Sequence, residues 1–136
     1  MFRVLDDSTF VSGQIGSEDV AQAAALGVTM IVNNRPDGEE PGQPAGGEIA
    51  AAAEAAGLAY RHIPVAGGFA PEQVETMAEA LEAAEGKVLA FCKSGTRSTF
   101  LWALAEKRRG GDGAAIMEQA AAAGYDLSPL RPYLLG

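Results

Sequence analysis

The sequence predicts an α/β fold in which helices cover both faces of a mostly parallel central sheet. Three short apolar runs have the composition of buried strands: Val28–Asn33, Leu58–Val65 and Lys87–Phe91. Segments typical of helices alternate with these runs, and that alternation indicates βαβ units. The chain has 136 residues, which is the size of one ordinary domain. We therefore expect residues 1–136 to form a single domain.

Glycine, proline and capping residues mark where the expected elements begin and end. Before the three apolar runs, Phe2–Leu5 and Thr9–Ser12 are expected to be two short strands joined by a polar turn. The expected helices are Ser17–Leu26, Gly47–Ala56, Pro71–Glu85, Ser98–Arg109 and Asp112–Ala123, with a helical turn within Ser128–Leu134, while the Pro- and Gly-rich acidic run Asn34–Gly47 is expected to be a loop.

The composition argues against several classes of protein. The formal net charge is −8, so nucleic acid and anionic membrane surfaces are not expected as partners. One cysteine excludes an intrachain disulfide, and with a single histidine it leaves no adequate ligand set, so neither a metal nor another cofactor is expected. The chain contains no apolar stretch of the roughly 18 residues that a membrane span needs, and its start lacks the pattern of a signal peptide. The expected location is the cytoplasm.

Residues with nucleophilic, charged or hydroxyl side chains concentrate around Cys92, at the end of a predicted strand and just before a predicted helix. The N–H groups at a helix N-terminus bind anions, and the same field should lower the pKa of the thiol. Arg97 can hold an oxyanion through two parallel hydrogen bonds. We expect Cys92 to be the nucleophile rather than a buried small hydrophobe, and Arg97 to bind the anion. The other residues expected in this anion-binding loop are Lys93, Ser94, Gly95, Thr96 and Ser98.

The run CKSGTRS, Cys92–Ser98, resembles the active loop of rhodanese-type sulfurtransferases. It is also similar to the loop of cysteine-dependent phosphatases. Those phosphatases usually have one more residue between the cysteine and the arginine, and a histidine before the cysteine. Here four residues separate Cys92 from Arg97, and Phe91 precedes the cysteine.

Four segments together resemble one small bacterial family, the phosphatase-like domain of beta-lactamase hydrolase-like proteins. They are Ser12–Val20, Val32–Pro44, Tyr60–Val65 and Phe91–Ser98, within a resemblance that spans Val11–Arg108. That family has the fold of dual-specificity phosphatases and also occurs fused to metallo-β-lactamase-type dioxygenases of sulfur metabolism. The resemblance implies a cysteine-phosphatase-like fold.

The leaving group distinguishes the two reactions that this resemblance allows. Phosphate ester cleavage expels an alkoxide or phenoxide, which an acid normally protonates. The phosphatases that this chain resembles place an Asp after the strand corresponding to Tyr60–Val65, whereas the chain has Ala66–Phe69 there, without an acid. Sulfur transfer from thiosulfate expels sulfite, which needs no proton. We therefore expect a sulfurtransferase that forms a Cys92 persulfide, uses thiosulfate or a persulfide as donor, and passes sulfur to an acceptor thiol or to a persulfide-metabolising partner protein.

Two alternatives remain open. The first is a tyrosine- or dual-specificity-like phosphatase with a Cys92 phosphocysteine intermediate, in which one carboxylate of the acidic loop, Asp37, Glu39 or Glu40, supplies the proton. Asn34, Arg35 and His62 would then line the pocket for the phosphoester, although a turn, a salt bridge and strand packing explain Asp37, Arg35 and His62 without function. The second is a module that binds anions or persulfides without catalysis.

Overall fold

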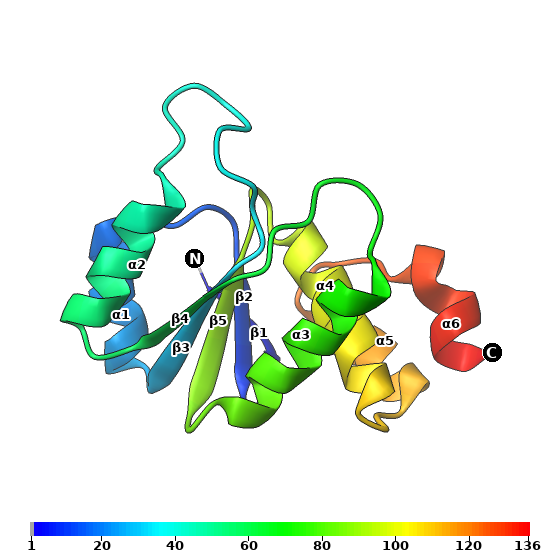
Figure 1. Ribbon diagram of the computed structural model, residues 1–136. Helices are drawn as coiled ribbons and strands as arrows, with labels where there is room; N and C mark the ends of the chain where they lie inside the picture. Colours follow the sequence, from blue (N-terminus) through cyan, green and yellow to red (C-terminus); the bar gives the residue numbers. More distant parts are fainter. Residues whose placement is uncertain (1) are drawn as a thin grey trace.

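The computed structural model describes residues 2–136 and shows a five-stranded sheet in the order β1-β2-β5-β3-β4 (Figure 1). β1 pairs with β2 in the antiparallel sense, and the other neighbouring strands are parallel. The predicted α/β fold with a mostly parallel sheet is therefore confirmed. The strands are β1 (Arg3–Asp6), β2 (Thr9–Ser12), β3 (Val28–Asn33), β4 (Ala59–His62) and β5 (Lys87–Phe91).

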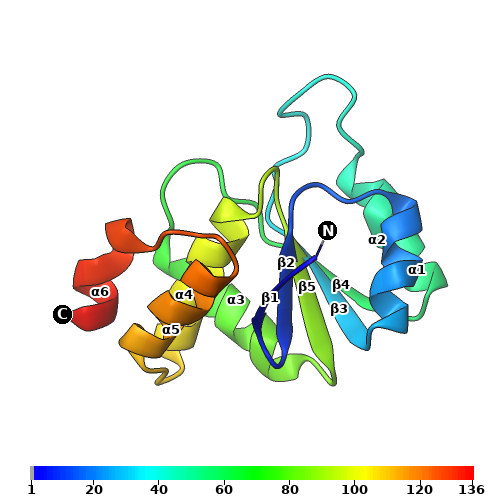
Figure 2. The same ribbon diagram turned by 180° about the vertical axis from the view of Figure 1, so that it is seen from behind.

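Helices cover both faces of the sheet, as predicted (Figures 1 and 2). α1 and α2 pack on one face, while α3, α4 and α5 pack on the other. Within residues 2–136, no helix has both the length and the apolar character needed to cross a membrane. The helical segments are α1 (Ser17–Ala25), α2 (Gly46–Ala55), α3 (Pro71–Ala83), α4 (Thr96–Arg108), α5 (Gly113–Ala122), the 3₁₀ turn η1 (Ser128–Leu130) and α6 (Arg131–Leu135).

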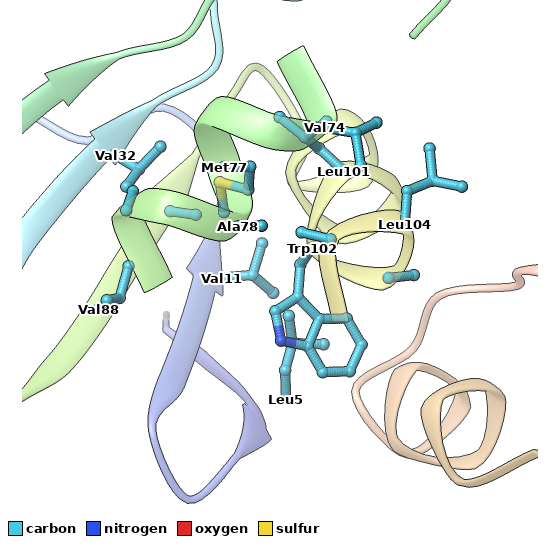
Figure 3. Close-up of a cluster of buried hydrophobic side chains, with 14 of the residues drawn as sticks. Leu5, Val11, Val32, Val74, Met77, Ala78, Val88, Leu101, Trp102 and Leu104 are labelled. Carbon is cyan, nitrogen blue, oxygen red and sulfur yellow. The ribbon is translucent and has the colours of Figure 1, made fainter. Parts of the chain in front are cut away.

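Alternating side chains of the central strands supply two separate hydrophobic layers. Ile31 of β3 and Leu89 of β5 point toward α1 and α2. Val32 and Val88, on the opposite face of the same strands, join the layer that includes Trp102 of α4 (Figure 3). Side chains alternate between the faces of a strand, so two short apolar strands anchor both helical layers.

Several element boundaries differ by a residue or two from the sequence-based expectation, and two differences, at β4 and at the start of α4, have a clear cause. The strand expected over Leu58–Val65 is regular only from Ala59 to His62, and Pro64, which has no N–H donor, follows it closely. The helix expected to begin at Ser98 begins at Thr96, because Gly95 takes a φ of 91° as its N-cap and turns the chain directly into the helix.

We predict that Met77→Ala lowers the free energy of unfolding by about 2–5 kcal/mol, because Met77 is fully buried between the sheet and α4 and its removal leaves a cavity. Urea unfolding followed by circular dichroism measures the change. Met117→Ala is the matched control, since Met117 of α5 is only partly buried and should cost distinctly less. Equal losses in the two variants would contradict this description of the core.

Candidate active site

The register of the parallel strands brings three loops to one edge of the sheet. Phe91, the last residue of β5, pairs with Ser12 of β2 on one side and with Asn33 of β3 on the other. The segments that follow β2, β3 and β5 therefore begin at the same level. Figure 1 shows the long loop between β3 and α2 projecting from this end, near the turn between β5 and α4. Ligands of open α/β sheets bind at this edge.

Cys92 lies at the centre of this edge and is completely buried. Its backbone N–H donates to the Ser12 carbonyl at 3.3 Å, and its Sγ accepts the Gly95 N–H at 3.1 Å. The turn also places the sulfur beside the N-terminus of α4, where the first N–H groups have no acceptor within the helix. These donors and the helix dipole favour negative charge on the sulfur and on a bound oxyanion.

Arg97 is held by a carboxylate from the loop after β3. Its Nη1 and Nη2 donate to the two Glu39 oxygens at 2.7 and 2.9 Å, and Nη1 also donates to the Val65 carbonyl at 2.7 Å. The hydrogen bonds to Glu39 raise the pKa of Arg97. Hydrogen bonds from Arg97 and then from Arg35 lower the pKa of Glu39 from 4.5 to about 2. Glu39 is therefore ionised at neutral pH and cannot serve there as a proton donor.

Arg35 is a second, nearly fully buried guanidinium beside this pair. Its Nε donates to Glu39 at 2.9 Å, its Nη2 to Glu40 at 2.7 Å and its Nη1 to the Gln14 side-chain oxygen at 3.1 Å. Lys93 adds an exposed ion pair with Glu40 at 3.3 Å. Two acidic and three basic side chains thus form one network, and Glu39 occupies the guanidinium of Arg97 that a substrate anion would bind.

Three other predicted residues, Asn34 and Asp37 after β3 and His62 at the end of β4, hydrogen-bond to the backbone. The Asn34 side chain donates to the Ile63 carbonyl at 2.9 Å, and His62 lies with Nε2 at 3.0 Å from the Arg35 carbonyl. Asp37 accepts the Gly46 N–H at 2.7 Å, at the first residue of α2. Asp37 therefore anchors the acidic loop to a helix N-terminus, and its expected role as catalytic acid stays a prediction.

The hydroxyl residues of the loop have different surroundings. Ser94 and Thr96 are exposed, with their oxygens 3.1 Å apart. Ser98 is fully buried, and its hydroxyl has no hydrogen-bond partner among residues 2–136. The Ser98 hydroxyl therefore donates neither to the Cys92 sulfur nor to another acceptor among these residues.

Two contacts of the site were missed from the sequence. Gln14, which binds Arg35, follows β2, so the strand order was needed to place it. Tyr125 donates its hydroxyl to the Ser94 carbonyl at 3.0 Å, from the segment that follows α5. No local pattern in the sequence connects Tyr125 with residues more than thirty positions earlier.

Comparison with known proteins identifies the family. Residues 1–109 match the family described as "Beta-lactamase hydrolase-like protein, phosphatase-like domain". The chain is also 42% identical over 103 residues to a beta-lactamase hydrolase-like protein of Xylella fastidiosa, a match that covers 75% of this chain and 24% of that protein. The chain therefore belongs to this family, and it spans about a quarter of the length of the curated relatives that it matches.

Solved structures support the same assignment. A putative phosphatase from Neisseria meningitidis is 36% identical, with a TM-score of 0.83, and the match covers 97% of this chain and 94% of that one. Human DUSP28 is 22% identical, with a TM-score of 0.68 and coverage of 98% and 90%. The second likeness shows the fold alone. Together they confirm the expected cysteine-phosphatase-like fold. The family match and the 36% identical relative support the phosphatase alternative better than the sulfur transfer that we expected from the sequence.

We predict that Glu39→Gln tightens the binding of inorganic sulfate or phosphate about fivefold to tenfold, because an anion bound by Arg97 must displace the Glu39 carboxylate. The gain should be constant across neutral pH. The low pKa of Glu39 means that the pair is fully formed above pH 4.5 and is lost only as the pH falls toward 2.

Titration calorimetry measures this affinity, and Glu40→Gln is the control. It removes the same charge from the network but breaks contacts to Arg35 and Lys93 rather than to Arg97. An equal gain in both variants would show that general charge, and not the occupation of Arg97, sets the affinity.

We also predict that Asp37→Ala lowers the free energy of unfolding by about 0.5–2 kcal/mol, since it removes the acceptor for an N–H at the start of α2. The rate of Cys92 alkylation by iodoacetamide should stay within twofold of wild type. Denaturant unfolding and the alkylation rate are measured on the same samples. A stable variant that has lost catalytic activity would instead support Asp37 as the acid.

Proposed function

We propose that this chain is a cysteine-dependent phosphatase-like hydrolase in which Cys92 attacks a small tetrahedral oxyanion. The observation that carries the proposal is the position of Cys92 Sγ, which accepts the Gly95 N–H at the N-terminus of α4, the helix whose first turn contains Arg97. The family match and the phosphatase fold favour phosphate monoesters as the substrate class. The Neisseria meningitidis relative is itself described as a putative phosphatase.

The reaction proceeds in two displacement steps. The Cys92 thiolate forms a bond to phosphorus, and the bond from phosphorus to the ester oxygen breaks, so that the alcohol leaves as its anion. Water then attacks phosphorus, the S–P bond breaks, and inorganic phosphate leaves with the thiolate restored. Arg97 and the loop N–H groups stabilise the charge on the equatorial oxygens in both steps.

The carboxylates around Cys92 restrict which esters react. Glu39 is ionised and paired with two arginines, Asp37 binds the start of α2, and Ala66–Phe69 contains no acid. The first step therefore lacks a ready proton donor in this arrangement. We expect efficient turnover only for esters whose leaving group is stable without a proton.

Sulfur transfer is the second candidate. The lack of a ready proton donor favours it over ester hydrolysis, because its leaving group, sulfite, needs no proton. The Cys92 thiolate would attack the outer sulfur of thiosulfate, a new S–S bond would form, and sulfite would leave with the electrons of the broken bond. No proton is needed in this step. The short spacing of four residues between Cys92 and Arg97 supports the same reading. A small thiol or a partner protein would then accept the sulfur.

We predict that, across a series of aryl phosphates with rising leaving-group pKa, kcat/KM falls steeply, because no acid protonates the departing oxygen. Phosphate release measures the rates, and Cys92→Ser, which keeps the fold but lacks the thiolate, should be inactive throughout. A flat series would show that a side chain does supply the proton.

An assay of the same protein with thiosulfate as sulfur donor and cyanide as acceptor distinguishes sulfur transfer from phosphate ester hydrolysis. Sulfite release that exceeds phosphate release from every ester, and that needs Cys92, would establish sulfur transfer as the main reaction. Binding of anions without turnover of either substrate class would overturn both and leave a binding module.

A further inference from the structure

The Tyr125 side chain covers the outer side of the anion-binding loop. Its hydroxyl donates to the Ser94 carbonyl oxygen at 3.0 Å. The contact is close enough that a side-chain carbon added at Gly95 would overlap the Tyr125 hydroxyl. Figure 2 shows that the segment between α5 and η1, which carries Tyr125, passes near the start of α4. Tyr125 lies beyond residues 1–109, which match the family.

The peptide unit that Tyr125 holds is the same unit that contacts the nucleophile. The Ser94 carbonyl and the Gly95 N–H belong to one peptide bond, and that N–H donates to Cys92 Sγ at 3.1 Å. In a trans peptide the C=O and N–H groups point in opposite directions. Tyr125 on one side and Cys92 on the other therefore fix the orientation of a single peptide plane.

Arg3 of β1 holds the segment that carries Tyr125. Its guanidinium lies 5.7 Å from the centre of the Tyr125 ring and also donates to the Ala123 carbonyl, two residues earlier, at 2.7 Å. Burial raises the pKa of Tyr125, so its hydroxyl keeps its proton at neutral pH and can donate. The hydroxyl is thus directed at the Ser94 carbonyl by packing against β1.

The peptide needs this restraint because glycine has little conformational preference of its own. Gly95 has a φ of 91°, and glycine populates positive and negative φ about equally. A rotated peptide would direct the Ser94 carbonyl, instead of the Gly95 N–H, toward the sulfur. The negative end of that dipole would repel the thiolate and the oxyanion that Arg97 binds.

We propose that Tyr125 is a positioning residue that orients the Ser94–Gly95 peptide so that its N–H stabilises negative charge on Cys92. This inference rests on the nucleophilic role of Cys92 in the proposed function. Two charged groups lie near Cys92 besides the neutral Tyr125: Arg97 of α4, which interacts with Cys92, and Lys93, which follows Cys92 in the chain. Neither contacts the Ser94 carbonyl, so the effect of the Tyr125 hydroxyl is separable from theirs.

The test compares Tyr125→Phe with wild type in the pH profile of Cys92 alkylation by iodoacetamide. The variant keeps the ring over Arg3 and removes only the hydroxyl. We expect alkylation at neutral pH to slow about threefold to tenfold, and the pH of half-maximal rate to move upward, because the thiolate loses part of its stabilisation. Tyr133→Phe is the control, since Tyr133 of α6 is half exposed and lines a different pocket, with Phe69 and Arg108, away from the Cys92 loop.

A profile for Tyr125→Phe that matches wild type would overturn the proposal. A lower melting temperature with an unchanged profile would likewise assign Tyr125 a structural role only. The readout does not need turnover. If neither protein hydrolyses phosphate esters or uses thiosulfate, while the two alkylation profiles still differ, the proposed function fails and the role of Tyr125 stands.

Discussion

The parallel register of β5 between β2 and β3 is the constraint on which the site depends. Phe91 is level with Ser12 on one side and Asn33 on the other, so the residues that follow the three strands meet at one edge. Neighbouring strands lie about 4.8 Å apart, and a slip of one residue would turn each strand's side chains to the opposite face. Such a slip would bury the wrong residues in both hydrophobic layers, so the packing of the core also fixes the position of Cys92.

The charge network at this edge combines stability with function. Arg35 is nearly fully buried, and a buried guanidinium without partners would destabilise the fold strongly. Glu39 and Glu40 satisfy it, and Glu39 reaches Arg97 as well. In the proposed function, the Glu39 carboxylate that pairs with Arg97 competes with the substrate anion. Affinity for the substrate is then a difference between two sets of charge-assisted hydrogen bonds.

Local sequence patterns predicted the elements of the fold well, because each is marked by its own residues. Val28–Asn33 and Lys87–Phe91 are β-branched or apolar runs between glycines and charged turns, and both are strands with those bounds. The strand that was expected to end at Val65 ends at His62, since periodicity alone does not show where an edge strand leaves the ladder. The start of α4 was displaced because the φ of Gly95 is decided by the turn and not by propensity.

The sequence grouped the candidate site residues that are contiguous, but it did not connect those that are distant in the chain. Cys92 to Ser98 lie together because they are consecutive around a helix N-terminus. Arg35 was recognised as a residue of the site and as a salt-bridge candidate for the acidic loop, yet the choice of Glu39 as the partner of Arg97 depends on loop conformation. Tyr125 reaches Ser94 only through the packing of α5 against β1 and α4.

The central claim is that Cys92 carries the transferred group, and the mass of the intact protein tests it most directly. Reduced protein would be mixed with an aryl phosphate or with thiosulfate, and the reaction would be quenched in acid within the first turnover. Mass spectrometry would then give the mass of the intact protein. We expect one covalent adduct, a phosphoryl group or a single sulfur atom according to the reaction, mapped by peptide digestion to Cys92 and absent from Cys92→Ser. Turnover of substrate by wild type with no adduct at any time, or an adduct that persists in Cys92→Ser, would contradict it.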